Sequence, residues 1–222
     1  DLMDGENPTL APYAKEGECY LRVTAKAADE QQADEMCAPV IEEIRNRLGE
    51  FVYGIDVESL EALVVKELLQ QGKKLATAES CTGGLLAKRI TDISGSSAVF
   101  DMGCVTYANE AKEALLYVPH EILEAHGAVS EETACAMAEG IVRRSGSDLG
   151  IGITGIAGPD GGTEQKPVGL IYIALSDGSQ TWVVKRSPIG RTKNREWHRH
   201  CAASQALDMV RRYLEGLPVT VE

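Results

Sequence analysis

The stretch LATAESCTGGLLAKRITDI, residues 75–93, contains the pattern that decides the fold of this chain. A short β-type segment at 75–78 is followed by a turn at Gly83 and Gly84, after which apolar residues recur at helical spacing. Paired glycines allow a tight turn and a close approach of a ligand to the backbone. A strand that passes directly into a helix is the repeating unit of α/β proteins. The stretch therefore predicts one such unit.

The same alternation of strand and helix extends to both sides of this stretch. Besides 84–93, the predicted helices are 56–71, 110–117, 119–126, 130–144 and 192–214, and the further predicted strands are 98–107, 149–154, 170–175 and 180–186. Asp56 and Ser130 are the expected N-caps of two of these helices. The last two strands are expected to pair as a hairpin across residues 176–179. Residues 57–222 are therefore predicted to form a layered α/β domain.

Residues 1–54 are predicted to form a separate, small α+β unit. Apolar and polar residues alternate at 18–26, which indicates a half-buried strand, and an apolar stripe at helical spacing covers 29–48. Pro39 lies within this stripe and is expected to kink or divide the helix. A short strand is expected at 51–53.

The charge of the chain excludes several classes of partner. Its 222 residues include 34 Asp and Glu against 22 Lys and Arg, a net charge of −12. A general nucleic-acid binder would show a basic face, and an anionic membrane surface would repel this chain. No segment approaches the roughly 18 uninterrupted apolar residues of a bilayer helix. Residues 1–54 carry 12 acidic and 5 basic residues and lack a GxxG loop, which argues against RNA binding. We therefore expect neither a nucleic acid nor a membrane as partner.

The six cysteines are scattered and include no CxxC pair, so the sequence predicts neither a zinc ribbon nor a thioredoxin-like motif. A chain of this length can bury a core without disulfides, so we expect reduced thiols and a cytoplasmic location. His198 and His200 are two residues apart and would face different directions on a helix, so they do not predict a metal pair.

The segment AESCTGG, residues 78–84, is the first candidate for chemistry. Ser80, Cys81 and Thr82 are each possible nucleophiles at a strand-to-helix turn, and the helix start that follows offers free N–H groups. The alternative is that Thr82 only caps the helix and the glycines only turn the chain. The residues alone leave both interpretations open.

A second candidate, VTYANEAK at 105–112, lies at the next strand-to-helix junction. Tyr107 and Lys112 can face one cavity, where a desolvated lysine loses its proton easily and acts as a base. The alternative is a surface lysine on a helix capped by Asn109. Because most lysines are solvated, the residues alone favour that alternative.

Two more segments can bind a ligand. The string GITGIAGPDGG at 152–162 takes a buried strand into a glycine-rich loop, and ligands of open α/β sheets bind beyond the carboxyl ends of strands. Its alternative is a plain turn at 159–162. The basic cluster at 191–200 contains Arg195 and Arg199, which share a helix face and can clamp a phosphate or carboxylate. Its alternative is a solvated helix start with Arg–Glu pairs.

Several of these strings resemble one known family. In order along the chain, AESCTGG, VTYANEAK, GAVSEETA (127–134), GITGIAGPDGG and KPVG (166–169) resemble the C-terminal domain of the CinA family over roughly residues 57–222. Residues 1–54, including NPTLAPYAKEGECYLRVTAKA (7–27), resemble the small KH-type domain of the same family. The resemblance implies a layered α/β amidohydrolase domain preceded by a small KH-type α+β domain.

The stand-alone form of that C-terminal domain is a nicotinamide-nucleotide amidohydrolase. The resemblance therefore implies hydrolysis of the carboxamide of nicotinamide mononucleotide to nicotinic acid mononucleotide and ammonia, without a metal or an organic cofactor. It implies Ser80 as the nucleophile, deprotonated by Lys112 directly or through Tyr107, with Cys81 as an open alternative to Ser80. Backbone N–H groups after Thr82, or at Gly155, are expected to hold the oxyanion.

The substrate-binding residues that the resemblance implies are Thr82, Gly83, Gly84, Asn109, Thr154, Gly155, Arg195 and Arg199, with Arg191 as an alternative phosphate ligand. A homodimer is expected, and the nucleotide-pyrophosphatase domain that precedes these two domains in the family is absent from this chain. An alternative function is that of a competence- or damage-inducible fragment that acts mainly as a partner-binding module with little amidase activity.

Overall fold

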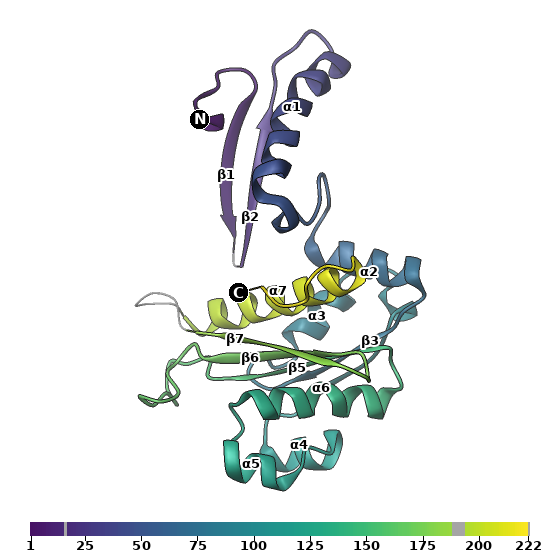
Figure 1. The fold of residues 1–222 in the computed structure, drawn as a ribbon, viewed down its shortest axis with the longest axis vertical. Helices are drawn as coiled ribbons and strands as arrows, with labels where there is room; N and C mark the ends of the chain where they lie inside the picture. Colours follow the sequence, from purple (N-terminus) through teal and green to yellow (C-terminus); the bar gives the residue numbers. More distant parts are fainter. Residues whose placement is uncertain (16, 188–193, 222) are drawn as a thin grey trace. The chain divides into compact units, whose positions relative to one another are not determined.

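The computed structural model describes residues 1–15, 17–187 and 194–221. The chain divides into two compact units, Asp1–Asp56 and Val57–Glu222 (Figure 1). Within the described residues, no helix combines the length and the apolar character needed to cross a membrane.

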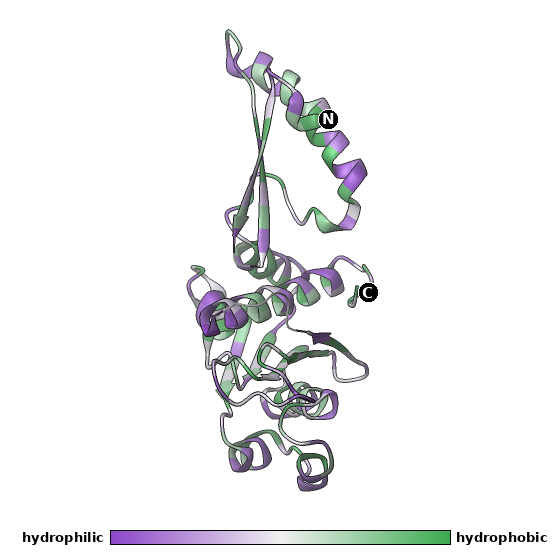
Figure 2. Cartoon of the chain, turned by 90° about the vertical axis from the view of Figure 1, so that its left-hand side faces the viewer, coloured by the Kyte–Doolittle hydropathy of each residue, from purple (hydrophilic) through white to green (hydrophobic). Residues whose placement is uncertain are grey.

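The first unit consists of a β-hairpin and one long helix (Figure 1). Strands β1 (Thr9–Lys15) and β2 (Glu18–Thr24) pair antiparallel. Helix α1 (Glu30–Leu48) is capped by Asp29, whose carboxylate accepts the N–H of Gln32 at 2.9 Å. Figure 2 shows both hydrophobic (green) and hydrophilic (purple) residues along α1, as an amphipathic helix requires.

Two local expectations for this unit are corrected by the structure. Of the two effects expected of Pro39, division of the helix does not occur, since α1 is continuous from Glu30 to Leu48. The expected strand at 51–53 does not form: Gly49 ends α1 with a φ of 54°, and Gly49–Phe51 makes a 3₁₀ turn.

The second unit is built on a five-stranded sheet with the order β4-β3-β5-β6-β7. The strands are β3 (Leu75–Glu79), β4 (Phe100–Val105), β5 (Leu149–Gly155), β6 (Ile171–Ser176) and β7 (Thr181–Arg186). β3 pairs parallel with both β4 and β5, whereas β6 runs antiparallel to β5 and β7. The predicted hairpin at the end of the sheet is therefore confirmed.

Helices cover both faces of this sheet (Figure 1). They are α2 (Leu60–Gln71), α3 (Leu85–Thr91), α4 (Asn109–Leu116), α5 (His120–His126), α6 (Glu131–Ser145) and α7 (Arg195–Leu214). α6 packs on β5 and β6 and contacts α4 and α5, while α7 packs on β6 and contacts α2 and α3. The three layers confirm the predicted layered α/β fold.

The start of α2 differs from the prediction. Ser59, rather than Asp56, caps the helix, and its hydroxyl accepts the N–H of Ala62 at 3.2 Å. Asp56 has a φ of 52°, in the left-handed region, so its backbone is not placed to begin a helix. The predicted cap of α6, Ser130, is confirmed by its bond to the N–H of Thr133.

Small residues bring α6 close to the centre of the sheet. A Cβ atom on Gly152 of β5 would lie 2.3 Å from the carbonyl oxygen of Ala134, and one on Gly150 would lie 2.6 Å from that of Ala138. Both contacts are shorter than van der Waals packing allows, so only glycine fits at these positions. The core is thus built by close backbone approach, in keeping with the low aromatic content of 5%.

The parallel strands set the position of the candidate site. Because β3, β4 and β5 run in the same direction, their carboxyl ends meet at one edge of the sheet. The segments that follow them contain Ser80, Tyr107 and the glycine-rich loop after Gly155. In open α/β sheets this edge is where ligands bind.

Candidate active site

Ser80 lies directly after β3, at the edge where the parallel strands end. Its N–H donates to the carbonyl oxygen of Ile153 in β5 (2.9 Å), and its own carbonyl oxygen accepts the N–H of Gly83 (3.1 Å). Gly83 and Gly84 have φ values of 58° and 90°, which favour glycine, so the chain turns sharply after Ser80. The side chain is 9% exposed. The hydroxyl is therefore held at a nearly buried strand end.

The N–H groups at the start of α3 are already paired. Those from Gly83 to Ala87 all donate within the protein, three of them to the buried carboxylate of Glu79 at 2.8–3.1 Å. They are therefore not free to hold an oxyanion, contrary to the expectation for N–H groups after Thr82. The alternative role of Thr82 as a helix cap is wrong as well, because the N-cap position is Gly84.

Lys112 extends from α4 toward Ser80 and is 1% exposed. Its Nζ lies 2.9 Å from the carbonyl oxygen of Thr106, 3.2 Å from that of Tyr107 and 3.4 Å from the Ser80 hydroxyl. The interpretation of Lys112 as a solvated surface lysine is therefore wrong. Asn109 does not cap α4 either, since the N-cap is Ala108 without a side-chain bond.

The surroundings of Lys112 favour the uncharged amine. Burial lowers the pKa of Lys112 below its ordinary value, because the ammonium loses its hydration. The neighbouring groups Cys81 and Glu110 oppose this effect in part. An amine that is more easily deprotonated, beside a hydroxyl, is the arrangement expected of a serine nucleophile and its base.

Cys81 is poorly suited to be the nucleophile. Its side chain is 5% exposed, and burial raises the pKa of the Cys81 thiol to about 12, an effect that the negative charge of Glu79 strengthens. Since the thiolate is the reactive form of cysteine, a thiol in this environment is inert near neutral pH. The choice that the sequence left open therefore favours Ser80. No disulfide bond joins the cysteines of the described residues.

Arg195 and Tyr107 meet at the same edge. The guanidinium of Arg195, at the first turn of α7, donates to the carbonyl oxygen of Gly158 (2.9 Å) and to the Tyr107 hydroxyl (3.1 Å). Tyr107 is 61% exposed, and Lys112 contacts its carbonyl oxygen rather than its hydroxyl. The hydroxyl is thus bonded to the arginine and not inserted between Ser80 and Lys112.

Arg199, one turn further along α7, binds the nucleophile turn itself. Its Nε and Nη2 donate to the carbonyl oxygen of Thr82 at 3.1 and 2.6 Å. In the hydrogen bonds described, the acceptors of Arg195 and Arg199 are carbonyl oxygens and the Tyr107 hydroxyl, and not a glutamate. The third arginine considered from the sequence, Arg191, lies outside the described residues.

The other expected binding residues lie around this group. The Thr154 hydroxyl donates to the carbonyl oxygen of Ala128 at 2.6 Å and so ties β5 to the segment before α6. A Cβ atom on Gly155 would lie 2.7 Å from the Cα of Ile171, so glycine is required there by packing. Asn109 begins α4 and is exposed.

Three residues of this arrangement were not among the predicted site residues: Glu79, Thr106 and Gly158. Each lies within a string singled out from the sequence, and Glu79 and Thr106 directly precede a predicted residue. Thr106 and Gly158 contribute backbone carbonyl oxygens, which the residue type does not reveal. Glu79 carries the one usable signal, a carboxylate directly before a Gly-containing turn into a helix.

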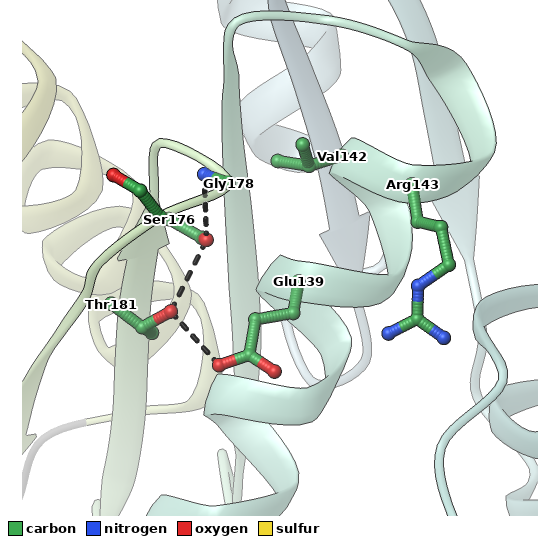
Figure 3. Close-up of a pocket in the computed structure, with 7 residues that line it drawn as sticks. Glu139, Val142, Arg143, Ser176, Gly178 and Thr181 are labelled. Atoms are coloured by element: carbon green, nitrogen blue, oxygen red, sulfur yellow. Dashed lines mark hydrogen bonds between the residues drawn. The ribbon is translucent and has the colours of Figure 1, made fainter.

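A hollow lies beside the end of β6 that pairs with the start of β5 (Figure 3). It is lined by Glu139, Val142, Arg143, Ser176, Gly178, Ser179 and Thr181. Ser176 pairs with Gly150, near the start of β5, so this hollow is remote from Ser80. Several of its polar groups bond to one another: the Thr181 hydroxyl bonds to Glu139 at 2.9 Å and to the Ser176 hydroxyl at 3.1 Å. The chemistry described above therefore belongs to the edge that carries Ser80.

The fold and the site define a class of protein: a layered α/β domain with a buried lysine beside a strand-end serine, joined to a small hairpin-and-helix unit. The chain belongs to the CinA family. The family model "CinA C-terminal domain" matches residues 57–214, and the model "Damage-inducible protein CinA KH domain" matches residues 1–54.

Curated relatives and solved structures agree with this assignment. A CinA-like protein of Desulfovibrio desulfuricans is 56% identical over 99% of this chain and 52% of its own length. A CinA-like protein of Kosmotoga olearia is 51% identical over 96% of this chain and 51% of its own length. The chain thus spans about half the length of these relatives. The competence/damage inducible protein CihA from Agrobacterium tumefaciens has a TM-score of 0.67 and 39% identity, covering 73% of this chain and 97% of its own.

Proposed function

We propose that residues 57–222 hydrolyse the carboxamide of nicotinamide mononucleotide to nicotinic acid mononucleotide and ammonia. The observation that carries this proposal is the 3.4 Å approach of the buried Lys112 Nζ to the Ser80 hydroxyl. Distances at the long end of the hydrogen-bond range commonly shorten when a substrate binds.

The partners of Lys112 suit a neutral amine acting as a base. An uncharged amine has two N–H donors and one lone pair. Two of its neighbours, the carbonyl oxygens of Thr106 and Tyr107, can only accept, so they take the two N–H groups. The lone pair is then left for the proton of Ser80. This division of partners supports direct proton transfer from Ser80 to Lys112.

The chemical step follows from these positions. Lys112 takes the hydroxyl proton as the Ser80 oxygen attacks the carboxamide carbon, and a tetrahedral oxyanion forms. The protonated Lys112 then gives its proton to the leaving nitrogen, the C–N bond breaks, and ammonia departs. Water hydrolyses the resulting ester, with Lys112 again as the base, and releases the carboxylic acid and free Ser80.

The oxyanion needs donors that the helix start does not supply. Within the described part of the chain, the N–H groups of Cys81 and Thr82 donate to no other residue. Both directly follow Ser80, where backbone donors commonly hold the oxyanion of an acyl-transfer reaction. We assign the oxyanion to these two N–H groups.

The arginines at the start of α7 account for the phosphate of the substrate. A guanidinium has five N–H donors, and Arg195 uses two of them on Gly158 and Tyr107. The remaining donors of an exposed Arg195 can bind a phosphate in an otherwise acidic chain. Arg199 has donors to spare in the same way, next to the nucleophile turn.

The test is release of ammonia from nicotinamide mononucleotide by this chain, with nicotinic acid mononucleotide identified as the second product. The matched control is Ser80→Ala, which removes one oxygen atom from the site. Ammonia release by the wild-type chain and not by Ser80→Ala supports the proposal, and its absence from the wild-type chain contradicts it.

A second candidate function is that of a partner-binding module with a role in competence or the response to damage, to which the names of the solved relatives refer. The same assay separates the two functions, since a binding module releases no ammonia. We also propose that this chain forms a homodimer, which sedimentation of the chain tests. The pyrophosphatase domain that precedes these two domains in the family is likewise a proposal for this protein.

A further inference from the structure

Glu79 is hydrogen-bonded both to the turn that follows the nucleophile Ser80 and to the segment that orients the base Lys112. It is the last residue of β3, directly before Ser80, and its side chain is 1% exposed. Its Oε2 accepts the N–H groups of Gly84 (3.0 Å) and Leu86 (3.1 Å), and its Oε1 accepts that of Ala87 (2.8 Å). Burial of a carboxylate is costly unless several hydrogen bonds compensate it.

These bonds replace the ordinary cap of α3. Gly84 occupies the N-cap position and has no side chain to accept the first helical N–H groups. The carboxylate of Glu79 reaches forward across the turn and accepts the N–H group of Gly84 and the helical N–H groups of Leu86 and Ala87. The turn that contains Ser80, Cys81 and Thr82 is therefore bridged by one side chain. Glu79 precedes the turn, and the N–H groups that it accepts follow the turn.

The backbone of Glu79 reaches the base as well. Its carbonyl oxygen accepts the N–H of Thr106 at 2.9 Å, and the carbonyl oxygen of Thr106 accepts a hydrogen bond from Lys112. Glu79 is thus bonded through its side chain to the turn after the nucleophile and through its backbone to the segment that orients the base.

We propose that Glu79 is a positioning residue that fixes the Ser80 turn relative to Lys112 by tying the start of α3 to the end of β3. This inference rests on the proposed amidohydrolase function for its kinetic consequences. It also implies that the start of α3 is closed to anions, so that the substrate phosphate binds the α7 arginines.

The decisive variant is Glu79→Gln, which keeps the length of the side chain but presents an NH₂ group to backbone N–H donors. We expect kcat for nicotinamide mononucleotide to fall by about 100-fold, the size of effect that a misplacement of about 1 Å can produce. KM should change by less than about threefold, because binding depends mainly on the α7 arginines. The pH at which the rate reaches half its maximum should stay in place, since Lys112 is still the base.

The matched control is Glu61→Gln. Glu61 pairs with Arg89 of α3 at 2.8 Å, so this variant also removes a carboxylate that holds α3, but on the side away from the turn. It should lower stability and leave kcat near the wild-type value. Glu79→Asp keeps the charge but is one methylene shorter, and it should retain more activity than Glu79→Gln.

A second readout does not depend on activity. Amide hydrogen exchange of the segment 80–92 should become faster in Glu79→Gln and not in Glu61→Gln. If the wild-type chain releases no ammonia but this difference in exchange appears, the proposed function fails and the positioning of the turn stands. Unchanged kcat and unchanged exchange in Glu79→Gln would overturn the inference, as would failure of both Glu79 variants to fold, which would make Glu79 a requirement of folding.

Discussion

Nη2 of Arg195 donates a hydrogen bond to the Tyr107 hydroxyl at 3.1 Å, although the two residues are 88 positions apart in the sequence. Tyr107 follows β4, and Arg195 begins α7. The same guanidinium also binds the carbonyl oxygen of Gly158 in the loop after β5. One arginine therefore joins three segments at the sheet edge, next to the Ser80–Lys112 pair.

Arg195→Ala should remove much of the preference for a nucleotide over a nucleoside. Hydrogen bonds to a charged group contribute roughly 1.5–3 kcal/mol each, so loss of one or two corresponds to about 10-fold or more in kcat/KM. Comparison of nicotinamide mononucleotide with nicotinamide riboside measures this effect. Equal efficiency of the wild-type chain on both substrates would remove the phosphate clamp from the account.

Tyr107→Phe should raise KM more than it lowers kcat. The variant loses only the hydroxyl, which orients Arg195 and does not contact Lys112. We expect KM to rise by about 3- to 10-fold, the effect of one lost hydrogen bond of about 1 kcal/mol. A fall of kcat by about 1,000-fold at unchanged KM would instead show that the Tyr107 hydroxyl relays the proton.

The reaction should become faster as the pH rises through the pKa of Lys112. Only the neutral amine accepts the Ser80 proton, and burial lowers this pKa below the ordinary value of 10.5. A pH profile of kcat/KM should rise from acid pH and level off above a pKa lower than 10.5. A profile that falls over this range would contradict the role of Lys112 as a base.

The same pKa shift predicts how stability changes with pH. Between the lowered pKa of folded Lys112 and 10.5, the unfolded chain binds more protons than the folded protein, so the free energy of unfolding should rise with pH across this window. Urea unfolding at several pH values should show this rise in the wild-type chain. Lys112→Met should lack this contribution, and an identical pH dependence in both chains would argue against a lowered pKa.

Gly152→Ala should destabilise the protein independently of its function. The added Cβ atom would lie 2.3 Å from the carbonyl oxygen of Ala134, so α6 must shift away from β5. Such overpacking costs about 1–3 kcal/mol or more, measured as a lower urea midpoint. Gly103→Ala, whose Cβ atom would meet only side-chain atoms at 3.2 Å, is the matched control and should cost less.

The fold was largely predictable because its signals are local. Alternation of strand and helix, the hairpin turn after β6 and the cap at Ser130 each depend on a few neighbouring residues. One error arose where two local signals competed. Asp56 and Ser59 are both good caps, and only the left-handed backbone of Asp56 decides between them.

The site was predictable in its residue types and not in its contacts. The sequence alone favoured a solvated Lys112, because most lysines are solvated. The partners of the buried Lys112 include the backbone carbonyl oxygens of Thr106 and Tyr107, and a carbonyl oxygen is present in every residue type. The carboxylate of Glu79 lies five residues before the N-cap of α3, outside the positions where capping patterns are read.

The central claim is that Ser80 and Lys112 act as one unit. If so, removal of either should abolish most of the chemical step, and the two losses should not add. The most direct measurement is kcat for ammonia release from nicotinamide mononucleotide by Ser80→Ala, Lys112→Ala and the double variant, with Cys81→Ala as control and folding of each variant verified. We expect each single variant to lose about 1,000-fold or more, the double variant to be little worse, and Cys81→Ala to keep substantial activity. A nearly active Lys112→Ala, or an active Ser80→Ala beside an inactive Cys81→Ala, would contradict the account.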